Sequence, residues 1–239
     1  MIVLKSEREL TKMRQAGKIT GQILHELAAM VKPGVKTIDL DRRAEELVAQ
    51  FDAQAAFKGY QGYPGSVCVS VDNQVVHGIP GERVLQEGQI VSLDFGVVYD
   101  GFYGDSAVTV PVGSVDPEVA KLIEVTQTAL EQGIAQAVVG NRLSDIAHAV
   151  QQYVEAHNFS VVRECVGHGI GRQMHEAPPV PNYGLPNRGP RLKVGMTLAI
   201  EPMVNAGSWE VEALADGWTV VTKDGSHINW VGVTEVNYA

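Results

Sequence analysis

The sequence predicts a mixed α/β fold. Two stretches of helical periodicity are followed by glycine-punctuated segments rich in β-branched residues, and the same order returns in the second half of the chain. A chain of 239 residues with 45% apolar and 20% charged residues can form a substantial core. We expect one domain over residues 1–239, with related halves of about 1–110 and 111–239. The expected β-rich segments are residues 66–71, 89–112, 196–204 and 217–223.

Four helices are predicted, two in each half. Ser6 followed by Glu9 is a capping box at the start of the first helix, which the Lys32-Pro33-Gly34 turn ends. Asp116-Pro117 supplies an N-cap and a proline at the first position of the third helix. The expected ranges are about 7–30, 39–51, 117–130 and 144–157.

A weak internal repeat supports two related halves. Segments 33–48 and 139–154 share glycine, basic, acidic and apolar residues at equivalent positions, although amphipathic helices can match in this way by chance. The offset between these two segments also carries Asp94 to position 200, next to Glu201. Each half would then place a carboxylate on an equivalent strand, with a site between them.

A hairpin is expected within residues 89–112. Asp100-Gly101 favours a two-residue turn, which places position 94 opposite position 107. Asp94 and Asp105 would then project from one face as diagonal neighbours, ~7–8 Å apart. A three-residue loop would instead put them on opposite faces.

Four possible metal ligands stand in short apolar segments. Burying an unpaired carboxylate costs several kcal/mol, so such groups are normally paired or bound to a metal. Each one alone could be a hydrogen-bonded residue at a strand end. Together, an oxygen-rich set with one imidazole suits a catalytic divalent ion better than a tetrahedral structural zinc. The four residues are Asp94, Asp105, His168 and Glu201.

Glycines surround His168 in the segment GHGIG. Because glycine tolerates unusual dihedral angles, we expect this backbone to approach the metal closely. A tight turn is the simpler alternative, and a phosphate loop lacks support because no GK[ST] ending follows. His77 and His175 are further candidates, although histidines in such loops are often structural or exposed.

Charge and cysteine content exclude several classes of protein. A net charge of −9 argues against nucleic acid as the main partner. The two cysteines, Cys68 and Cys165, are far apart, which disfavours both a disulfide framework and a cysteine zinc site and indicates a reducing compartment. No run reaches ~18 apolar residues, and the N-terminus lacks a signal-peptide pattern. We expect a soluble, cytoplasmic monomer.

Five ordered motifs resemble a known family. In order and spacing they resemble the type I methionine aminopeptidases, over about residues 4–226. The resemblance implies the pita-bread fold, with two pseudo-symmetric halves around a central metal site. It also implies metal-dependent removal of the N-terminal methionine from nascent proteins whose second residue is small. The motifs are GYPGSVCVSVDNQVVHGIP, LDFGVVYDGFYGDSAVTV, ECVGHGIGRQMHEAPPVPNYG, LAIEPMVNAG and DGWTVVTKDGS.

The resemblance also implies roles for individual residues. Glu201 would move the proton as well as bind metal, and His77 and His175 would contact the substrate amide and stabilise the developing negative charge. Up to two divalent ions (Co, Mn, Fe, Zn or Ni) would be held by Asp94, Asp105, His168 and Glu201. The methionine pocket would be lined by residues that could each be ordinary core: Tyr60, Tyr63, Cys68, Met174 and Trp218.

The C-terminal end departs from the family pattern. The family has a bridging glutamate in a Q[FY]EHT strand after the KDGS turn, whereas this chain reads KDGSHINWVGVTEVNYA. Aligned without a gap, the glutamate position falls on Gly232. Glu235 is the nearby carboxylate, but an offset of three residues in a strand favours the opposite face. We therefore expect a weak second metal site and reduced activity.

Two other functions stay open. The lost glutamate favours a catalytically impaired pita-bread protein that acts as a binding module, whereas the retained histidines and carboxylates oppose it. A prolidase or aminopeptidase P relative would usually carry an additional N-terminal domain, for which this chain has no room. Nascent polypeptide N-termini are the expected partners and the ribosome is a candidate partner, with no membrane and no sequence-specific nucleic acid.

Overall fold

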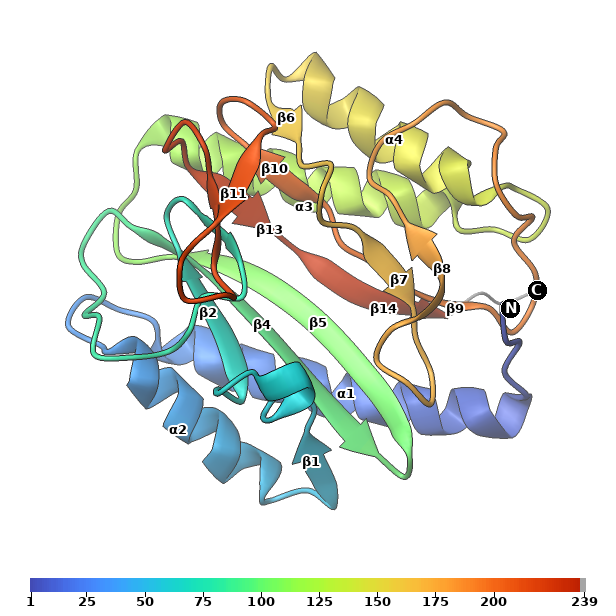
Figure 1. The fold of residues 1–239 in the computed structure, drawn as a ribbon, viewed down its shortest axis with the longest axis horizontal. Coiled ribbons are helices and arrows are strands. Elements are labelled where there is room, and N and C mark those ends of the chain that lie inside the picture. Colours follow the sequence, from blue (N-terminus) through green and yellow to red (C-terminus); the bar gives the residue numbers. More distant parts are fainter. Residues whose placement is uncertain (237–239) are drawn as a thin grey trace.

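The computed structural model describes the backbone of residues 1–236 and the side chains of residues 1–233. Strands lie between two helix pairs (Figure 1). The first pair packs on the strands that follow it, and the second pair packs on strands from the end of the chain. The helices are α1 (Glu7–Met30) with α2 (Thr37–Val48), and α3 (Pro117–Gln136) with α4 (Leu143–Ala156).

An eight-stranded sheet joins the two halves of the chain. Its order is β1-β4-β5-β14-β9-β7-β8, and β2 pairs with β4 beside this path. Strand β14 is the link, because it pairs antiparallel with β5 on one side and with β9 on the other. The strands are β1 (Ala53–Ala55), β2 (Val67–Val71), β4 (Ile90–Tyr99), β5 (Phe102–Pro111), β7 (Gly167–Gly169), β8 (Glu176–Val180), β9 (Thr197–Ile200) and β14 (Gly232–Val236).

Two three-stranded sheets and a short 3-10 helix, η1 (Tyr60–Gly62), complete the described architecture. The predicted β-rich segment 196–204 is interrupted at Glu201-Pro202, so β9 enters the large sheet and β10 enters a small one. The small sheets are β13 (Ile228–Trp230) with β10 (Met203–Asn205) and β6 (Ser160–Val161), and β11 (Val211–Ala213) with β12 (Val220–Thr222) and β3 (Gln74–Val76).

The helix boundaries follow the predicted caps closely. The Ser6 backbone N–H and hydroxyl both donate to Glu9 Oε2, at 2.9 and 2.8 Å, so the expected capping box forms. The predicted extension of the second helix to Phe51 is wrong, because α2 ends at Val48. The backbone N–H of Phe51 instead bonds to the Val48 carbonyl in a tight turn. Phe51 still packs on the core, which explains why apolar periodicity continued past the helix end.

The two helix pairs share a local geometry at the offset of the predicted repeat. Gly34 and Gly140 both adopt positive φ, at 93° and 98°. Asp39 and Asp145 each accept a hydrogen bond from the backbone N–H three residues earlier. This equivalence supports a repeated helix-pair unit in each proposed half.

The β4–β5 hairpin has the expected register. Tyr99 pairs with Phe102 across the two-residue turn, and Asp94 lies opposite Ala107. Asp105 stands two residues before Ala107, so it shares a face with Asp94. The prediction that both carboxylates project to one side is therefore confirmed.

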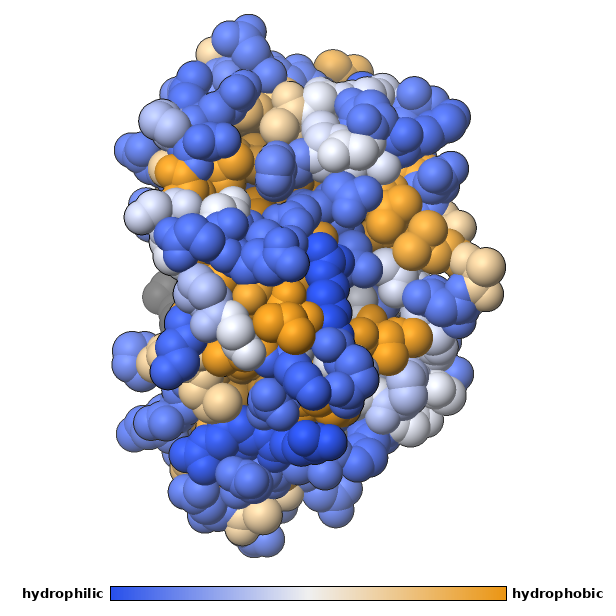
Figure 2. All heavy atoms as spheres, turned by 90° about the vertical axis from the view of Figure 1, so that its left-hand side faces the viewer, coloured by the Kyte–Doolittle hydropathy of each residue, from blue (hydrophilic) through white to orange (hydrophobic). Residues whose placement is uncertain are grey.

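Apolar side chains are concentrated inside the fold. Leu40 and Phe95 are fully buried between α1, α2 and the β4 region, while Ile146 and Ile200 are fully buried on the other half. Figure 2 shows one face on which apolar residues form small separate groups among hydrophilic ones. Among the described residues, no helix is long and apolar enough to cross a membrane.

Gly104 provides a test of how closely α1 lies on β5. A Cβ at this position would lie 2.6 Å from the Ala16 carbonyl carbon and 2.7 Å from the Gly17 nitrogen, both backbone atoms of α1. We expect Gly104→Ala to lower the free energy of unfolding by about 2–3 kcal/mol, because the helix must shift. Urea denaturation of the metal-free protein measures this change.

Gly21→Ala is the matched control. Gly21 is an exposed glycine within α1 with no atom within 4 Å of an added Cβ. Removing a helix-interior glycine should raise the free energy of unfolding by ~0.5–1 kcal/mol. Similar effects from both substitutions would contradict a close helix–strand contact at Gly104.

Candidate metal centre

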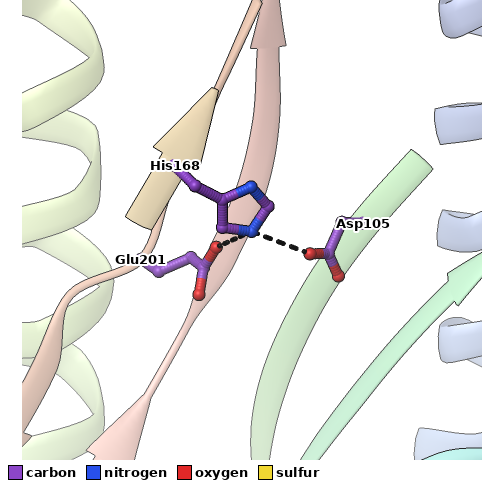
Figure 3. Close-up of side chains that lie close together, drawn as sticks. All are labelled: Asp105, His168 and Glu201. Carbon is purple, nitrogen blue, oxygen red and sulfur yellow. Dashed lines mark ion pairs between the residues drawn. The ribbon is translucent and has the colours of Figure 1, made fainter. Parts of the chain in front are cut away.

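Asp105, His168 and Glu201 meet between β5, β7 and the end of β9. His168 Nε2 lies 3.4 Å from Asp105 Oδ2 and 3.2 Å from Glu201 Oε1. Figure 3 shows the imidazole pointing at both carboxylates. One ligand atom from each residue lies within 4.8 Å of the others, which makes the three a candidate site for a metal ion. Asp94, on the neighbouring strand, is buried beside them and lines the same cavity.

Strand pairing brings these residues together. β14 joins β5 to β9, so Asp105 approaches Glu201, which directly follows β9. His168 pairs with Ala199 of β9. His168 Nδ1 lies 2.9 Å from the Gly169 carbonyl oxygen and donates to it, which leaves Nε2 for the carboxylates. Strand pairing therefore places Asp105 and His168, and Glu201 lies directly after the end of β9.

The glycines around His168 serve strand packing. A Cβ on Gly167 would lie 2.2 Å from the Ala199 carbonyl oxygen, and one on Gly169 would lie 2.4 Å from the Ala177 carbonyl oxygen. The expected close approach of this backbone to a metal stays a prediction, and the observed role of Gly167 and Gly169 is to let β7 pack closely against its neighbours. The alternative of a tight turn is wrong at residues 167–169, because they form β7 between β8 and β9.

Crowded carboxylates dominate the electrostatics of the centre. Burial raises the pKa of Asp94, and the charges of Asp105 and Glu201 raise it further. Burial also raises the pKa of Glu201. Burial lowers the pKa of His168, but hydrogen bonds and charges from Asp105 and Glu201 outweigh it and raise that pKa to about 11. Without a metal ion, an imidazolium therefore offsets part of the negative charge.

Two further histidines line the cavity as neutral groups at pH 7. Burial and the nearby His168 lower the pKa of His175 to about 4. The His175 ring centroid lies 4.3 Å from that of His168, and its Nδ1 is 2.8 Å from the Tyr60 hydroxyl oxygen. Burial lowers the pKa of His77, whose ring lies edge-on to Trp218 at 6.1 Å.

An apolar slot adjoins the carboxylates within one cavity of about 360 Å³. Tyr63, Cys68 and Met174 are buried in a single cluster, and Tyr60 and Trp218 pack against it. The Tyr63 hydroxyl donates to the Gly78 carbonyl at 2.9 Å, so its polar atom is satisfied within the protein. All the residues predicted for the methionine pocket thus line one space with the candidate ligands.

Other residues that line the cavity were not predicted from the sequence. Phe57 belongs to the apolar cluster and stands three residues before Tyr60, next to a glycine-rich loop that could have pointed to it. Four further lining residues come from separate elements, and all but the last lie within the motifs of the family resemblance. They are Val76, Cys165, Met203 and Trp230.

Gly232 stands where the missing glutamate was expected. It pairs with Ala107, and a Cβ built on it would lie 2.9 Å from Glu201 Cγ, so this position faces the carboxylates. Glycine offers no side-chain ligand there. The backbone of Glu235 pairs with Leu198, but its side chain lies outside the described residues, so the expectation that it points to the opposite face stays a prediction.

Comparisons with known proteins agree with this geometry. The model of metallopeptidase family M24 matches residues 11–231, ending one residue before Gly232. The chain is 55% identical to a methionine aminopeptidase from Clostridium perfringens over 94% of this chain and 90% of the relative. It is 52% identical to methionine aminopeptidase 1 from Bacillus subtilis over 100% and 98% of the two chains.

Solved structures support the same resemblance. A methionine aminopeptidase from Thermotoga maritima superposes with a TM-score of 0.98 at 45% identity, covering 99% of this chain and 96% of that one. An Xaa-Pro dipeptidase from Bacillus anthracis, at 21% identity and a TM-score of 0.75, shares the fold, and this chain covers 57% of it. The predicted family resemblance and pita-bread fold are confirmed.

Metal titration tests the centre. Because Asp105, His168 and Glu201 complete one ligand set and Gly232 adds none, we expect one tight Mn²⁺ site per chain and a second that fills only at high concentration. His168 carries a proton at pH 7 when metal-free, and metal ligation requires neutral imidazole, so binding should release about one proton or more. Affinity should therefore rise with pH. Calorimetric titration in buffers of different ionisation enthalpy measures both quantities.

Gly232→Glu is the informative variant and Gly232→Ala its control. The glutamate should tighten the second site once Glu201 Cγ adjusts, whereas alanine adds the same Cβ without a ligand. Two equally tight sites in the unaltered protein would show that another group supplies the bridge.

Proposed function

The chain belongs to metallopeptidase family M24 and to its methionine aminopeptidases, and we propose that it removes the first methionine from nascent polypeptides whose second residue is small. One observation carries the proposal: a candidate metal set and an apolar slot share one cavity of about 360 Å³. An apolar slot of this kind suits the flexible thioether side chain of methionine.

We propose Asp94, Asp105, His168 and Glu201 as the metal ligands. When bound, a divalent ion supplies a Lewis acid that polarises the scissile carbonyl and lowers the pKa of water. The oxygen-rich set with one imidazole suits Mn, Fe, Co, Zn or Ni in the first site. Gly232 contributes no ligand to a second site, which is consistent with weak occupancy and reduced activity.

Glu201 and two histidines would carry the chemistry on the protein side. The Glu201 carboxylate takes a proton from the attacking water and passes it to the leaving amine, a role that suits its raised pKa. In the tautomer whose Nδ1 accepts from the Tyr60 hydroxyl, neutral His175 carries its proton on Nε2 and can donate a hydrogen bond to the developing oxyanion. His77 would hold the substrate amide from the Trp218 side of the cavity.

Polypeptide N-termini are the proposed substrates, and Tyr60, Tyr63, Cys68, Met174 and Trp218 would hold the methionine side chain. A pure binding module would have no need of a buried carboxylate cluster, whose mutual repulsion costs stability. Cytoplasmic location, monomeric state and contact with the ribosome stay predictions.

The acid–base role of Glu201 has a direct test. Glu201→Gln keeps the size of the side chain but removes the titrating group, so hydrolysis should fall at least ~10²-fold. His175→Ala should cost on the order of 10-fold to 10³-fold through lost oxyanion stabilisation. Single-turnover assays at saturating Mn²⁺, with metal content measured in parallel, separate chemistry from metal loss. Unaltered rates in both variants would place the chemistry elsewhere.

Peptide choice tests the proposed function itself. Met-Ala-Ser should be cleaved and Leu-Ala-Ser cleaved far less, although an apolar pocket separates such similar groups by only ~1–3 kcal/mol. Peptides with a large second residue should resist cleavage. Equal turnover of Met and Leu peptides, or a requirement for proline in second place, would refute the methionine assignment. No turnover with Mn²⁺, Fe²⁺ or Co²⁺ would favour the binding module.

A further inference from the structure

A buried ion pair outside the metal centre holds the loop that carries Met174 and His175. Lys5 Nζ lies 2.6 Å from Glu176 Oε2, and the two side chains are 4% and 12% exposed. The other carboxylate oxygen, Oε1, accepts the backbone N–H groups of Arg172 at 2.8 Å and Gln173 at 3.2 Å. One carboxylate therefore ties the N-terminal segment to both ends of loop 171–176.

The lysine is itself fixed in place. Its backbone N–H donates to the Gly195 carbonyl at 2.7 Å, and Nζ also donates to the Val3 carbonyl at 3.2 Å. The pair packs directly on the loop backbone at Gly171, because a Cβ there would lie 2.4 Å from Lys5 Cε and 2.7 Å from Glu176 Oε1.

The position of the Lys5–Glu176 ion pair indicates its role more clearly than its contribution to stability does. Desolvation offsets much of the attraction in a buried ion pair, so such a pair is weak evidence for overall stability. Glu176, however, directly follows His175, whose ring contacts His168 and whose Nδ1 meets the Tyr60 hydroxyl at 2.8 Å. A displacement of about 1 Å can cost 10²-fold in rate when it misplaces a reacting group.

We propose that Lys5 and Glu176 are positioning residues that fix His175 at the metal centre, so that the segment before α1 forms part of the active site. The placement of the His175 imidazole is argued from the hydrogen bonds and the ion pair of Glu176. The expected effect of this placement on turnover rests on the proposed function.

Histidine side-chain ¹⁵N spectra of the metal-free protein test the placement without any activity. Lys5→Met should shift the His175 Nδ1 resonance, assigned with His175→Ala, and leave distant histidines such as His25 unchanged. Glu176→Gln, which retains an oxygen acceptor for the two loop N–H groups, should give the same shift and serves if Lys5→Met does not fold. The double variant should shift the resonance no further than either single one, because both changes remove the same contact.

Arg172→Met is the matched control. Arg172 lies in the same loop and pairs with Glu9, but its side chain is 65% exposed, so its loss should leave the His175 resonance in place. An unmoved His175 signal in both Lys5→Met and Glu176→Gln would overturn the proposal. So would equal shifts in Arg172→Met.

Kinetic measurements on the variants provide a second test of the proposal. Lys5→Met should lower kcat by ~10-fold or more, with Mn²⁺ affinity retained. In a His175→Ala background the same change should cost nothing further, because Lys5 acts through that imidazole. Equal losses in both backgrounds would indicate a merely structural role and defeat the proposal. A parent protein without turnover would defeat the proposed function instead, and the histidine resonance would then decide the placement.

Discussion

Mutual repulsion among three clustered carboxylates is the constraint on which the rest of this structure depends. Asp94 and Glu201 are buried and Asp105 is half-buried beside them, and like charges at such short range interact strongly. Such a cluster persists only if a rigid frame holds it and a cation compensates it. The eight-stranded sheet supplies the frame, and protonated His168 supplies the compensation until a metal ion replaces its proton.

The eight-stranded sheet does not depend on a side-chain ligand at position 232, because backbone hydrogen bonds join its strands. β14 joins the halves by pairing with β5 and β9, and that pairing needs no particular side chain at Gly232. The Thr109 hydroxyl also donates a hydrogen bond to the Trp230 carbonyl at 2.7 Å, just ahead of β14. The chain therefore keeps its fold with a glycine at the position where the family resemblance implies a bridging glutamate.

A second layer of contacts orients the groups that would face substrate. His168 is directed by the Gly169 carbonyl, and His175 by the Tyr60 hydroxyl and by the loop that Glu176 holds. The contacts that orient His175 join segments far apart in the chain, since Tyr60 lies 115 residues before His175 and Lys5 lies 171 residues before Glu176. Both imidazoles are thus fixed by the protein before any substrate arrives, which reduces the reorganisation needed for reaction.

The sequence by itself determined the features that arise from neighbouring residues. One capping box, one proline position and apolar periodicity located the helix starts to within two residues, although α3 continues six residues past its expected end, to Gln136. Asp100-Gly101 set the register that aligns Asp94 with Asp105. The order of motifs also pointed to His168 and Glu201. Only the tertiary structure decided what depends on distant segments meeting. The short strands, the strand-packing role of Gly167, the lining of the cavity by Cys165 and Trp230, and the Lys5–Glu176 pair arise from long-range packing, which no local pattern encodes.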